Sequence, residues 1–380
     1  MVMELFQKVD LAKIQWSQYR NGAEVSGYFE EMMEHGAQVY IKNVDVEFYL
    51  LAVDDLLLPL TKTNGNPFNS YVVSPFSHYV SYAIEELREL QQPLLEHCLK
   101  SVLQCLGLFL KWGKIDKVVM VNNWLLSTNL YEMITEQQVK EMTLFLQKRF
   151  PQETIMFRSL ASSLHPRLIS SLHEQQAIFV PSRSIYLFYP EKFSQISKKK
   201  RKTIRRDQRF LQKSGYWVDD KVSPIEMERV LELYNQLYLK KYSYFNPQFT
   251  LKYLQNAYER HLLGFRTLKK GNRIDGVVGF ITCNGVMTTP LLGYDTTMSR
   301  KVGLYRLCSM IQTEQSLQTG LLLHRSAGAG NFKRNRGAVN EVEYSSIIVS
   351  HLPIGRRIAW KTLAFLLNRI GVPLLKKFEL

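Results

Sequence analysis

Cysteine is scarce in this chain, and its arrangement gives no sign of a disulfide framework or a metal site. Only four cysteines occur in 380 residues, and no two of them form a Cys-x-x-Cys pair. Each lies in an apolar segment: Cys98, Cys105, Cys283 and Cys308. We therefore expect buried thiols in a reducing compartment, and no metal cofactor.

Long apolar runs are missing as well. A membrane-spanning helix needs ~18 or more consecutive apolar residues, and no run in the chain has them. Met1–Asp10 lacks the apolar core that a secretory signal peptide requires. These absences predict a cytoplasmic location, with contact at the inner face of a membrane left open by the C-terminal segment.

Acidic residues are outnumbered, with 34 Asp and Glu against 49 Lys and Arg, which gives a formal net charge of +15. Such a balance favours an acidic partner: nucleic acid, an anionic membrane, a phosphorylated ligand or an acidic carrier protein. Charge alone does not choose among these. No zinc-finger or RNA-recognition signature is present, so sequence-specific reading of DNA is not expected.

Strand and helix patterns alternate along the whole chain, which predicts an α/β (α+β) layered fold. The expected strands of the first half are Gln38–Lys42, Val44–Val53, Leu56–Leu60, Ser70–Val73, Ile115–Val121 and Thr154–Phe157, with helices at Tyr79–Leu90, Leu94–Trp112 and Glu136–Phe150. The expected strands of the second half are Ala177–Val180, Ile185–Tyr189, Phe265–Leu268, Asp275–Cys283, Met287–Tyr294, Leu321–His324 and Glu343–Val349, with helices at Pro166–Glu174, Gln195–Lys213, Ser223–Lys241, from Thr250, and at Gly303–Thr319. Both halves follow the order of hairpin strands, long helix and short strand.

One segment combines this order with the chemistry of a ligand site. A strand ending in Tyr294-Asp295 leads into a basic glycine loop, Ser299–Leu304, at the start of a helix. After the next short strand comes the glycine-rich run Ser326–Arg334. Free backbone N–H groups and the positive end of the helix dipole make such a loop a place to hold a phosphate-bearing ligand.

Three features of the second half resemble the GNAT acyltransferase fold, in particular its Fem-type peptidoglycan aminoacyl transferases and cellulose-biosynthesis-type acetyltransferases. The first is the basic run Lys198–Arg206 ahead of Gly215-Tyr216. The second is Gly293-Tyr294-Asp295 leading into the Gly303 helix, and the third is Gly330-Asn331-Phe332-Lys333. The resemblance covers roughly residues 165–350. Where the family's phosphate loop has several glycines, Arg300–Tyr305 keeps one, and Arg300 and Lys301 bring positive charge.

The resemblance implies tandem GNAT-like domains, each with a mixed central sheet flanked by helices. We expect a degenerate N-terminal domain at 1–163, an acyltransferase domain at 164–352, and a basic amphipathic C-terminal helix at 353–380. On a helical wheel of that last segment, Ala359, Trp360 and Leu363 share a broad apolar face. The face suits either an anionic membrane surface or the core of the domain.

The implied function is N-acyl transfer from acyl-CoA or an acyl-carrier-protein thioester to an amine. The residues expected to bind the donor are Arg300, Lys301, Gly303, Leu304, Gly328, Gly330 and Lys333. The candidates for acid–base chemistry are Asp295, Tyr294, His324 and Glu343. Each has a structural alternative: a strand-end aspartate that caps a turn, a histidine satisfied in the core, a glutamate facing solvent, or a solvated basic loop.

Two other functions are compatible with the same features. An aminoacyl-tRNA donor, as in Fem-type enzymes, suits the positive charge of the 198–213 helix. A non-catalytic, membrane-associated binding protein suits the reduced number of glycines in the phosphate loop.

Overall fold

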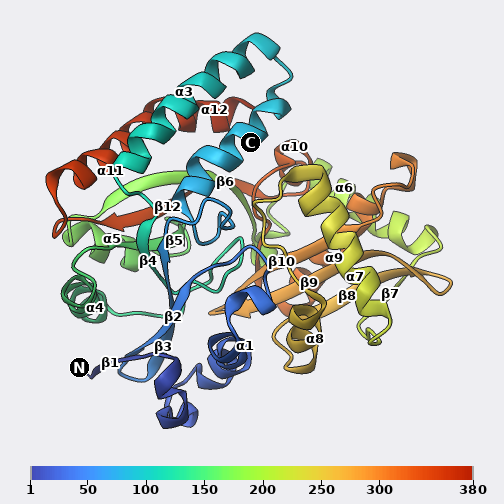
Figure 1. Ribbon diagram of the computed structural model, residues 1–380. Coiled ribbons are helices and arrows are strands. Elements are labelled where there is room, and N and C mark those ends of the chain that lie inside the picture. Colours follow the sequence, from blue (N-terminus) through green and yellow to red (C-terminus); the bar gives the residue numbers. More distant parts are fainter. Residues whose placement is uncertain (1, 379–380) are drawn as a thin grey trace. The chain divides into compact units, whose positions relative to one another are not determined.

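The computed structural model describes residues 2–378, which form two compact units (Figure 1). Unit 1 comprises residues 2–183, Phe245–Gln248 and Val342–Phe378, and unit 2 comprises Ser184–Tyr244 and Phe249–Glu341. These bounds differ from the divisions expected at 163/164 and 352/353, because residues 164–183 and 353–378 pack in unit 1. Each unit has a mixed sheet flanked by helices, which confirms the expected fold class.

The sheet of unit 1 combines antiparallel and parallel pairs. Its strands occur in the order β1 (Met3–Phe6), β2 (Glu47–Val53), β3 (Leu56–Asn64), β4 (Lys117–Val121), β5 (Thr154–Leu160), β12 (Val339–Ile348) and β6 (Ile178–Phe188). The pairs β2–β3 and β3–β4 are antiparallel, β4–β5 is parallel, and β5–β12 is antiparallel.

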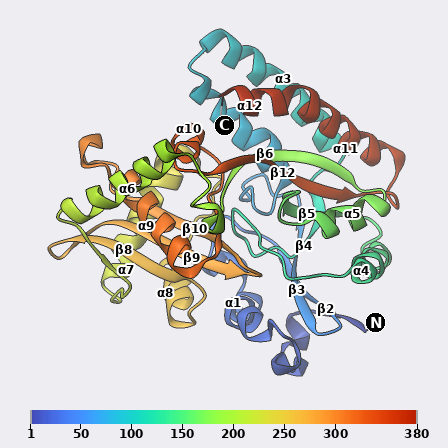
Figure 2. The ribbon, with the colours of Figure 1, turned by 180° about the vertical axis from the view of Figure 1, so that it is seen from behind.

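Helices cover both faces of this sheet (Figures 1 and 2). They are α1 (Gly22–His35), α2 (Ala83–Glu86), α3 (Pro93–Trp112), α4 (Glu136–Arg149), α5 (Pro166–Glu174), α11 (Ile354–Leu366) and α12 (Val372–Phe378), with a π-helical turn at Leu367–Gly371 between the last two. Successive side chains of a strand point to opposite faces. Accordingly Val119 and Val121 pack with α4 and α5, whereas Val118 and Met120 pack with α3 and α11.

The strands of unit 2 belong to the same 12-stranded sheet. Their order is β6, β11 (Leu322–His324), β10 (Val286–Tyr294), β9 (Arg273–Cys283), β8 (Gly264–Lys270) and β7 (Trp217–Asp219). The helices of this unit are α6 (Lys198–Lys213), α7 (Glu226–Tyr234) with a π-helical continuation at Asn235–Tyr242, α8 (Leu251–Glu259), α9 (Leu304–Thr319) and α10 (Gly330–Arg334).

The helices of unit 2 approach the sheet closely. Helices α6 and α9 share one apolar core with β8, β9, β10 and β11. Helix α7 lies against β10 so closely that a Cβ atom on Gly293 would be 2.7 Å from the carbonyl carbon of Leu233. Only glycine at this position permits that contact between helix and strand.

The same topology occurs twice. In unit 1 two antiparallel pairs lead to a parallel pair connected by a helix, in the order β2-β3-β4-α4-β5. In unit 2 the order β8-β9-β10-α9-β11 has the same pairing. The tandem arrangement implied by the family resemblance is therefore present in the fold.

Each unit also takes a strand from the other half of the sequence. Strand β6 follows β5 along the chain but pairs antiparallel with β11 of unit 2. Strand β12 follows β11 along the chain but pairs antiparallel with β5 of unit 1. We call this feature the strand exchange.

Several local expectations were wrong. Residues Gln38–Lys42 contain a 3₁₀ turn, Ala37–Val39, in place of a strand, and Ser70–Val73 is a turn. The two strands expected on either side of Pro181 form one strand, β6, because a proline removes only a single N–H from the ladder. Cys98 and Cys105 were expected to be buried, but both are exposed on α3.

Candidate functional site

The candidate site in unit 2 begins where two parallel strands separate. Strand β10 pairs with β11 over Val286–Thr288, and this pairing ends at His324, whereas β10 itself continues to Tyr294. Its register with β9 shifts between Thr288 and Leu291, which marks a bulge at Thr289-Pro290. A bulge re-aims the backbone and commonly lies beside an active site. Beyond Thr288, β10 is thus no longer paired with β11.

The helix that follows β10 starts at a glycine. Ser299 Oγ accepts a hydrogen bond from the Lys301 backbone N–H in a short turn, and Gly303 then forms the N-cap of α9 with φ +74°. A Cβ atom there would lie 3.0 Å from the Phe210 ring, so glycine is required both by conformation and by space. Gly303 has no side chain to cap the first-turn N–H groups, and Arg300 and Lys301 are exposed beside them. Leu304 is buried in the core, so only its backbone N–H is suited to a ligand.

Aromatic side chains connect the end of β10 to α9 and α10. The ring centroid of Tyr294 lies 6.1 Å from that of Tyr305, which lies 4.9 Å from that of Phe332. Burial raises the pKa of the Tyr294 hydroxyl, so this group stays protonated and is a proton donor rather than a base. Lys241 Nζ lies 3.4 Å from the same oxygen.

Asp295 is engaged by its neighbours. Its Oδ2 accepts a hydrogen bond of 2.6 Å from Arg229, and its Oδ1 accepts bonds from the N–H and hydroxyl of Thr297. Burial tends to raise the pKa of this carboxyl, but the bonds from Thr297 and Arg229 outweigh it and leave the pKa lowered. A carboxylate held in this way is a weak base, and its contacts are those of a strand-end cap.

His324, the last residue of β11, is 1% exposed. Its Nδ1 lies 3.2 Å from the Ser326 backbone nitrogen, whose N–H it accepts. In the neutral ring the proton is then on Nε2, which makes the outer nitrogen a donor. A role as hydrogen-bond donor therefore fits His324 better than the role of base.

Lys333 organises the glycine-rich loop from within. Its Nζ donates to the backbone oxygens of Arg325 at 2.6 Å, Ser326 at 3.2 Å and Ala327 at 2.7 Å, and the side chain is buried. Three donors on an ammonium group match three carbonyl acceptors. In the same loop Gly328 has φ +76°, and Gly330 begins α10. Lys333 thus fixes the path of the loop that was expected to contact a ligand.

Two further features of unit 2 were not expected from the sequence. Asp207 of α6, 2% exposed, accepts hydrogen bonds from Arg306 Nε at 2.6 Å and Arg336 Nε at 2.5 Å. Arg325 is 4% exposed, and its Nε and Nη1 have no hydrogen-bond partner among the described residues. Burial lowers the pKa of this guanidinium to about 10. Its Nη2 donates to the Ser309 carbonyl oxygen and the Thr313 hydroxyl, so Arg325 is a partly satisfied buried cation directly after β11.

Glu343 does not join these residues, because it belongs to unit 1. Its carboxylate forms a two-bond ion pair with Arg183, at 2.9 Å to Nε and 3.2 Å to Nη2. Strand β11 has β6 and β10 as neighbours, so His324 and Glu343 do not lie on neighbouring strands. The charges of Arg183 and Glu343 also act on the pKa values of Arg158 and His78 in unit 1. The remaining candidates (Tyr294, Asp295, Arg300, Lys301, Gly303, Leu304, His324, Gly328, Gly330 and Lys333) all lie in unit 2.

Within residues 2–378 no three His, Cys, Asp or Glu side chains are grouped in a way that holds a metal ion.

Comparison with known proteins found a family match for part of the chain. Residues 198–334 match the family described as the acetyltransferase (GNAT) domain. A conserved protein of unknown function from Bacteroides thetaiotaomicron VPI-5482 is similar in structure, with a TM-score of 0.51, 11% identity, and 91% of this chain and 99% of its own chain covered. A search of curated proteins found no match.

Two further solved structures are similar over about three fifths of the chain. The C-terminal domain of a putative lysylphosphatidylglycerol synthetase from Agrobacterium fabrum has a TM-score of 0.45 and 13% identity, with 61% of this chain and 78% of its own covered. FemX has a TM-score of 0.45 and 8% identity, with 59% and 79% covered.

The β10–β11 pair, connected by the helix that begins after Gly303 and contained within the matched residues, is that of a GNAT-type acyltransferase fold. Residues 198–334 thus match the acetyltransferase (GNAT) domain family, and the chain has a GNAT-type fold.

Proposed function

We propose that the protein is an N-acyltransferase that binds an acyl-CoA thioester in unit 2. The observation that carries this proposal is the early end of the β10–β11 pairing at Thr288 and His324, with β10 continuing to Tyr294. The open edge leaves backbone donors near the Thr289-Pro290 bulge for a thioester carbonyl. Side chains need not form that oxyanion site.

The phosphates of the donor bind at the start of α9. The first-turn N–H groups of a 16-residue helix point at the ligand, and Arg300 and Lys301 add charge on the preceding turn. The aromatic series Tyr294, Tyr305 and Phe332 lies between this turn and α10. The donor thus reaches from α9 to the open edge of β10.

In the transfer step the amine nitrogen attacks the thioester carbon, so that a C–N bond forms and the C–S bond breaks. The thiolate that leaves needs a proton, and the amine loses one to solvent. Tyr294 supplies the proton to sulfur, because its hydroxyl has a raised pKa and is protonated at neutral pH, and the tyrosinate then takes a proton back from solvent. The unsatisfied N–H groups of Arg325 stabilise the developing negative charge. Asp295, His324 and Lys333 are positioning residues in this proposal.

A second donor class is favoured by one observation. Helix α6 packs Ile204, Asp207 and Leu211 inward and presents Lys198, Lys199, Lys202, Arg205, Arg206, Arg209 and Lys213 to solvent. An exposed cationic helix of this kind suits the phosphates of an aminoacyl-tRNA or the acidic surface of an acyl-carrier protein. The thioester or ester reacts in the same way in each case, so the two readings differ in the donor alone.

Binding and turnover with paired variants test the proposal. Acetyl-CoA, a long-chain acyl-CoA, an acyl-carrier protein and an aminoacyl-tRNA are each offered to the full chain, and binding is followed by native mass spectrometry and thermal shift. For a CoA donor, R300A/K301A weakens binding by about tenfold or more, since each charge-assisted contact contributes about 1.5 kcal/mol or more. The variant R205E/R206E/R209E leaves CoA binding unchanged but abolishes binding of a tRNA or carrier donor.

The control K140A/K148A removes two exposed lysines of α4 in unit 1 and leaves binding of every donor unchanged. Release of a free thiol in the presence of amines then reports transfer. Tyr294→Phe lowers the rate of thiol release without changing donor affinity. Failure of all four donors to bind the folded wild-type protein would contradict the proposal and favour a non-catalytic binding protein.

A further inference from the structure

Helix α3 of unit 1 carries an exposed apolar stripe. Leu94, Cys98, Val102, Cys105, Leu108 and Trp112 recur every three or four residues, which places them on one side of the helix. Leu94 is 87% exposed, Leu108 71% and Trp112 65%. The opposite side packs inward through Gly107 and Leu110. An apolar stripe of this length on an exposed helix marks an interaction surface.

A second exposed stripe adjoins the first. Ile354, Ile358, Phe365 and Ile370 are exposed along α11 and the turn that follows it. Trp112 lies at the junction, because a Cβ atom on Gly355 would be 2.9 Å from the Trp112 ring. Both ribbon views show α3 running beside α11 and α12 (Figures 1 and 2). We call the two stripes together the apolar face.

The buried side of α11 argues against a membrane-spanning role for α11 in this fold. By length and composition, Pro93–Trp112 and Ile354–Leu375 are both apolar enough to cross a membrane. Ala359, Trp360 and Leu363 of α11, however, are fully buried in the core of unit 1 with β4 and β12 residues. A helix with one face in a protein core and the other exposed lies along a surface instead.

Cations outnumber acids on the helices that carry the apolar face. Exposed cations on or next to its helices are Lys100, Lys111, Lys114, Lys361, Arg369 and Lys377. The only acidic residue of α3 is Glu96, and residues 354–378 contain none. A second copy of the chain would bring the same positive charge to the face and be repelled. An anionic lipid surface complements both the charge and the apolar stripes.

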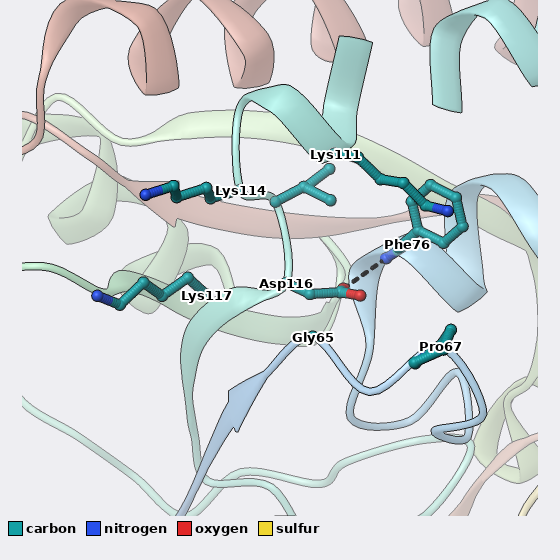
Figure 3. A pocket seen from close by; sticks show the side chains of 8 residues that line it. Gly65, Pro67, Phe76, Lys111, Lys114, Asp116 and Lys117 are labelled. Carbon is teal, nitrogen blue, oxygen red and sulfur yellow. Dashed lines mark hydrogen bonds between the residues drawn. The ribbon is translucent and has the colours of Figure 1, made fainter. Parts of the chain in front are cut away.

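A lysine-lined cavity lies at the end of α3 nearest Trp112 (Figure 3). It has a volume of about 580 Å³ and is lined by Gly65, Pro67, Phe76, Lys111, Lys114, Ile115, Asp116 and Lys117. The close-up shows Lys114 and Lys117 extending in one direction, while Lys111 lies over Phe76 with its Nζ 4.7 Å from the ring centroid. The carboxylate of Asp116 accepts bonds from the Phe76 N–H and the Ser74 hydroxyl, and so points to the side of Phe76 and Lys111, away from Lys114 and Lys117 (Figure 3). Lys111 and Lys114 are both exposed and extend to opposite sides of this cavity, so each can meet a separate phosphate group of an anionic surface.

We propose that the apolar face docks unit 1 on an anionic phospholipid membrane, with the α3 and α11 stripes in the interfacial layer and Lys111 and Lys114 on lipid phosphates. This proposal concerns unit 1 and is independent of the acyl transfer proposed for unit 2.

Vesicle flotation of the full chain tests the docking. Wild-type protein floats with vesicles of phosphatidylcholine and phosphatidylglycerol and stays unbound with phosphatidylcholine alone. Leu94→Ser combined with Leu108→Ser weakens binding by about tenfold or more, because burial of a leucine contributes about 1.5 kcal/mol or more. Lys111→Glu combined with Lys114→Glu weakens binding by a similar factor, since each cation near the surface contributes about 1 kcal/mol.

Matched controls distinguish binding through the apolar face from nonspecific binding by other exposed residues. Val9→Ser combined with Met133→Ser changes two exposed apolar residues outside the face, and K140E/K148E reverses two charges on α4. Both control variants bind as the wild type does. Circular dichroism verifies that every variant is folded, which is expected because the changed side chains are exposed.

Three outcomes would overturn the proposal. One is equal flotation of the face variants and the controls, and another is equal binding to vesicles of phosphatidylcholine alone. The third is absence of vesicle binding together with a wild-type dimer that L94S/L108S dissociates, since that would make a second copy the occupant of the face.

Discussion

His78 lies in the charged interior of unit 1. Its Nε2 is 3.0 Å from the Ser182 hydroxyl. Burial, and then the positive fields of Arg158 and Arg183, lower the pKa of the imidazole to about 3. The ring is therefore neutral at physiological pH, although an unperturbed histidine titrates near pH ~6.5. Protonation of His78 would add a third positive charge near Arg158 and Arg183.

The lowered pKa predicts acid destabilisation at this residue. Between about pH 6.5 and pH 3 the unfolded chain binds a proton at position 78 that the folded chain does not, so stability falls as pH falls, by about 1.4 kcal/mol per pH unit. His78→Gln removes this contribution and flattens the stability curve of the variant over that range. Urea unfolding at a series of pH values measures the slope, with His97→Gln, an exposed histidine on α3, as the control. Parallel curves for wild type and H78Q would contradict the prediction.

Contacts of single residues were the least predictable part of the site. The positions of Lys333, Asp295 and His324, at a loop and at strand ends, follow from the sequence pattern. Their partners do not, because Lys333 binds carbonyl oxygens of its own loop and Asp295 binds Arg229 from another helix. The sequence does contain an indication for Arg325, because this arginine directly follows a buried apolar strand. Arginine is rarely buried unless it is paired, so its place there points to a special role.

At the scale of the element, α6 depends on a single buried acid. The helix contains nine Lys and Arg residues and only one acidic residue, Asp207. The carboxylate lies between Arg306 of α9 and Arg336 beyond α10. Asp207 therefore connects α6 to α9, the helix that begins after Gly303, and to Arg336, which follows the glycine-rich loop and α10.

Asp207→Asn should destabilise the protein by about 3 kcal/mol or more, because it leaves two buried or half-buried guanidinium groups without their counter-charge. Chemical denaturation measures the loss, and Asp220→Asn, an exposed acid near the same helix, provides the control. In a double-mutant cycle D207N/R336M costs less than the sum of the single variants. A loss below about 0.5 kcal/mol, typical of surface substitutions, would contradict the role assigned to Asp207.

Elements with strong local signals were predicted well. Pro166 and Glu174 bound α5 as expected, Thr135 caps α4 through a capping box, and Gly320 ends α9 in the left-handed conformation. Strand β7 was missed, because its three residues carry no periodicity. Asp207 had an overlooked signal: it occupies the inward spacing shared by Ile204 and Leu211 on an otherwise charged helix.

At the scale of the whole molecule, the strand exchange was beyond prediction from sequence. Alternating patterns indicate that β6 and β12 exist, but nothing local to a strand specifies its neighbour in a sheet. Pairing is decided by packing: Met156 of β5 and Ile347 of β12 share one core with Trp360 of α11. The sequence favours a division at residue 163 because that residue lies in a turn between one series of strand and helix patterns and the next.

Cutting the chain at that turn should yield two parts that do not fold alone. Residues 1–163 lack β12 and α11, so Met156, Val118 and their neighbours would face water. We expect the fragment to show poor dispersion in its NMR spectrum and no cooperative thermal transition. Co-expression of residues 1–163 with 164–380 should restore a folded complex that survives gel filtration. A cooperative transition in the isolated 1–163 fragment would contradict the prediction.

The strand exchange also sets an order of events during protein synthesis. When β5 leaves the ribosome, its partner β12 and the covering helix α11 are still about 190 residues away along the chain. At bacterial or eukaryotic elongation rates of ~5–20 residues per second, that separation corresponds to roughly 10 to 40 s. During this interval the edge of β5 that later pairs with β12 is unpaired and exposed. Unit 1, although it contains the N-terminus, is therefore the later of the two to be completed.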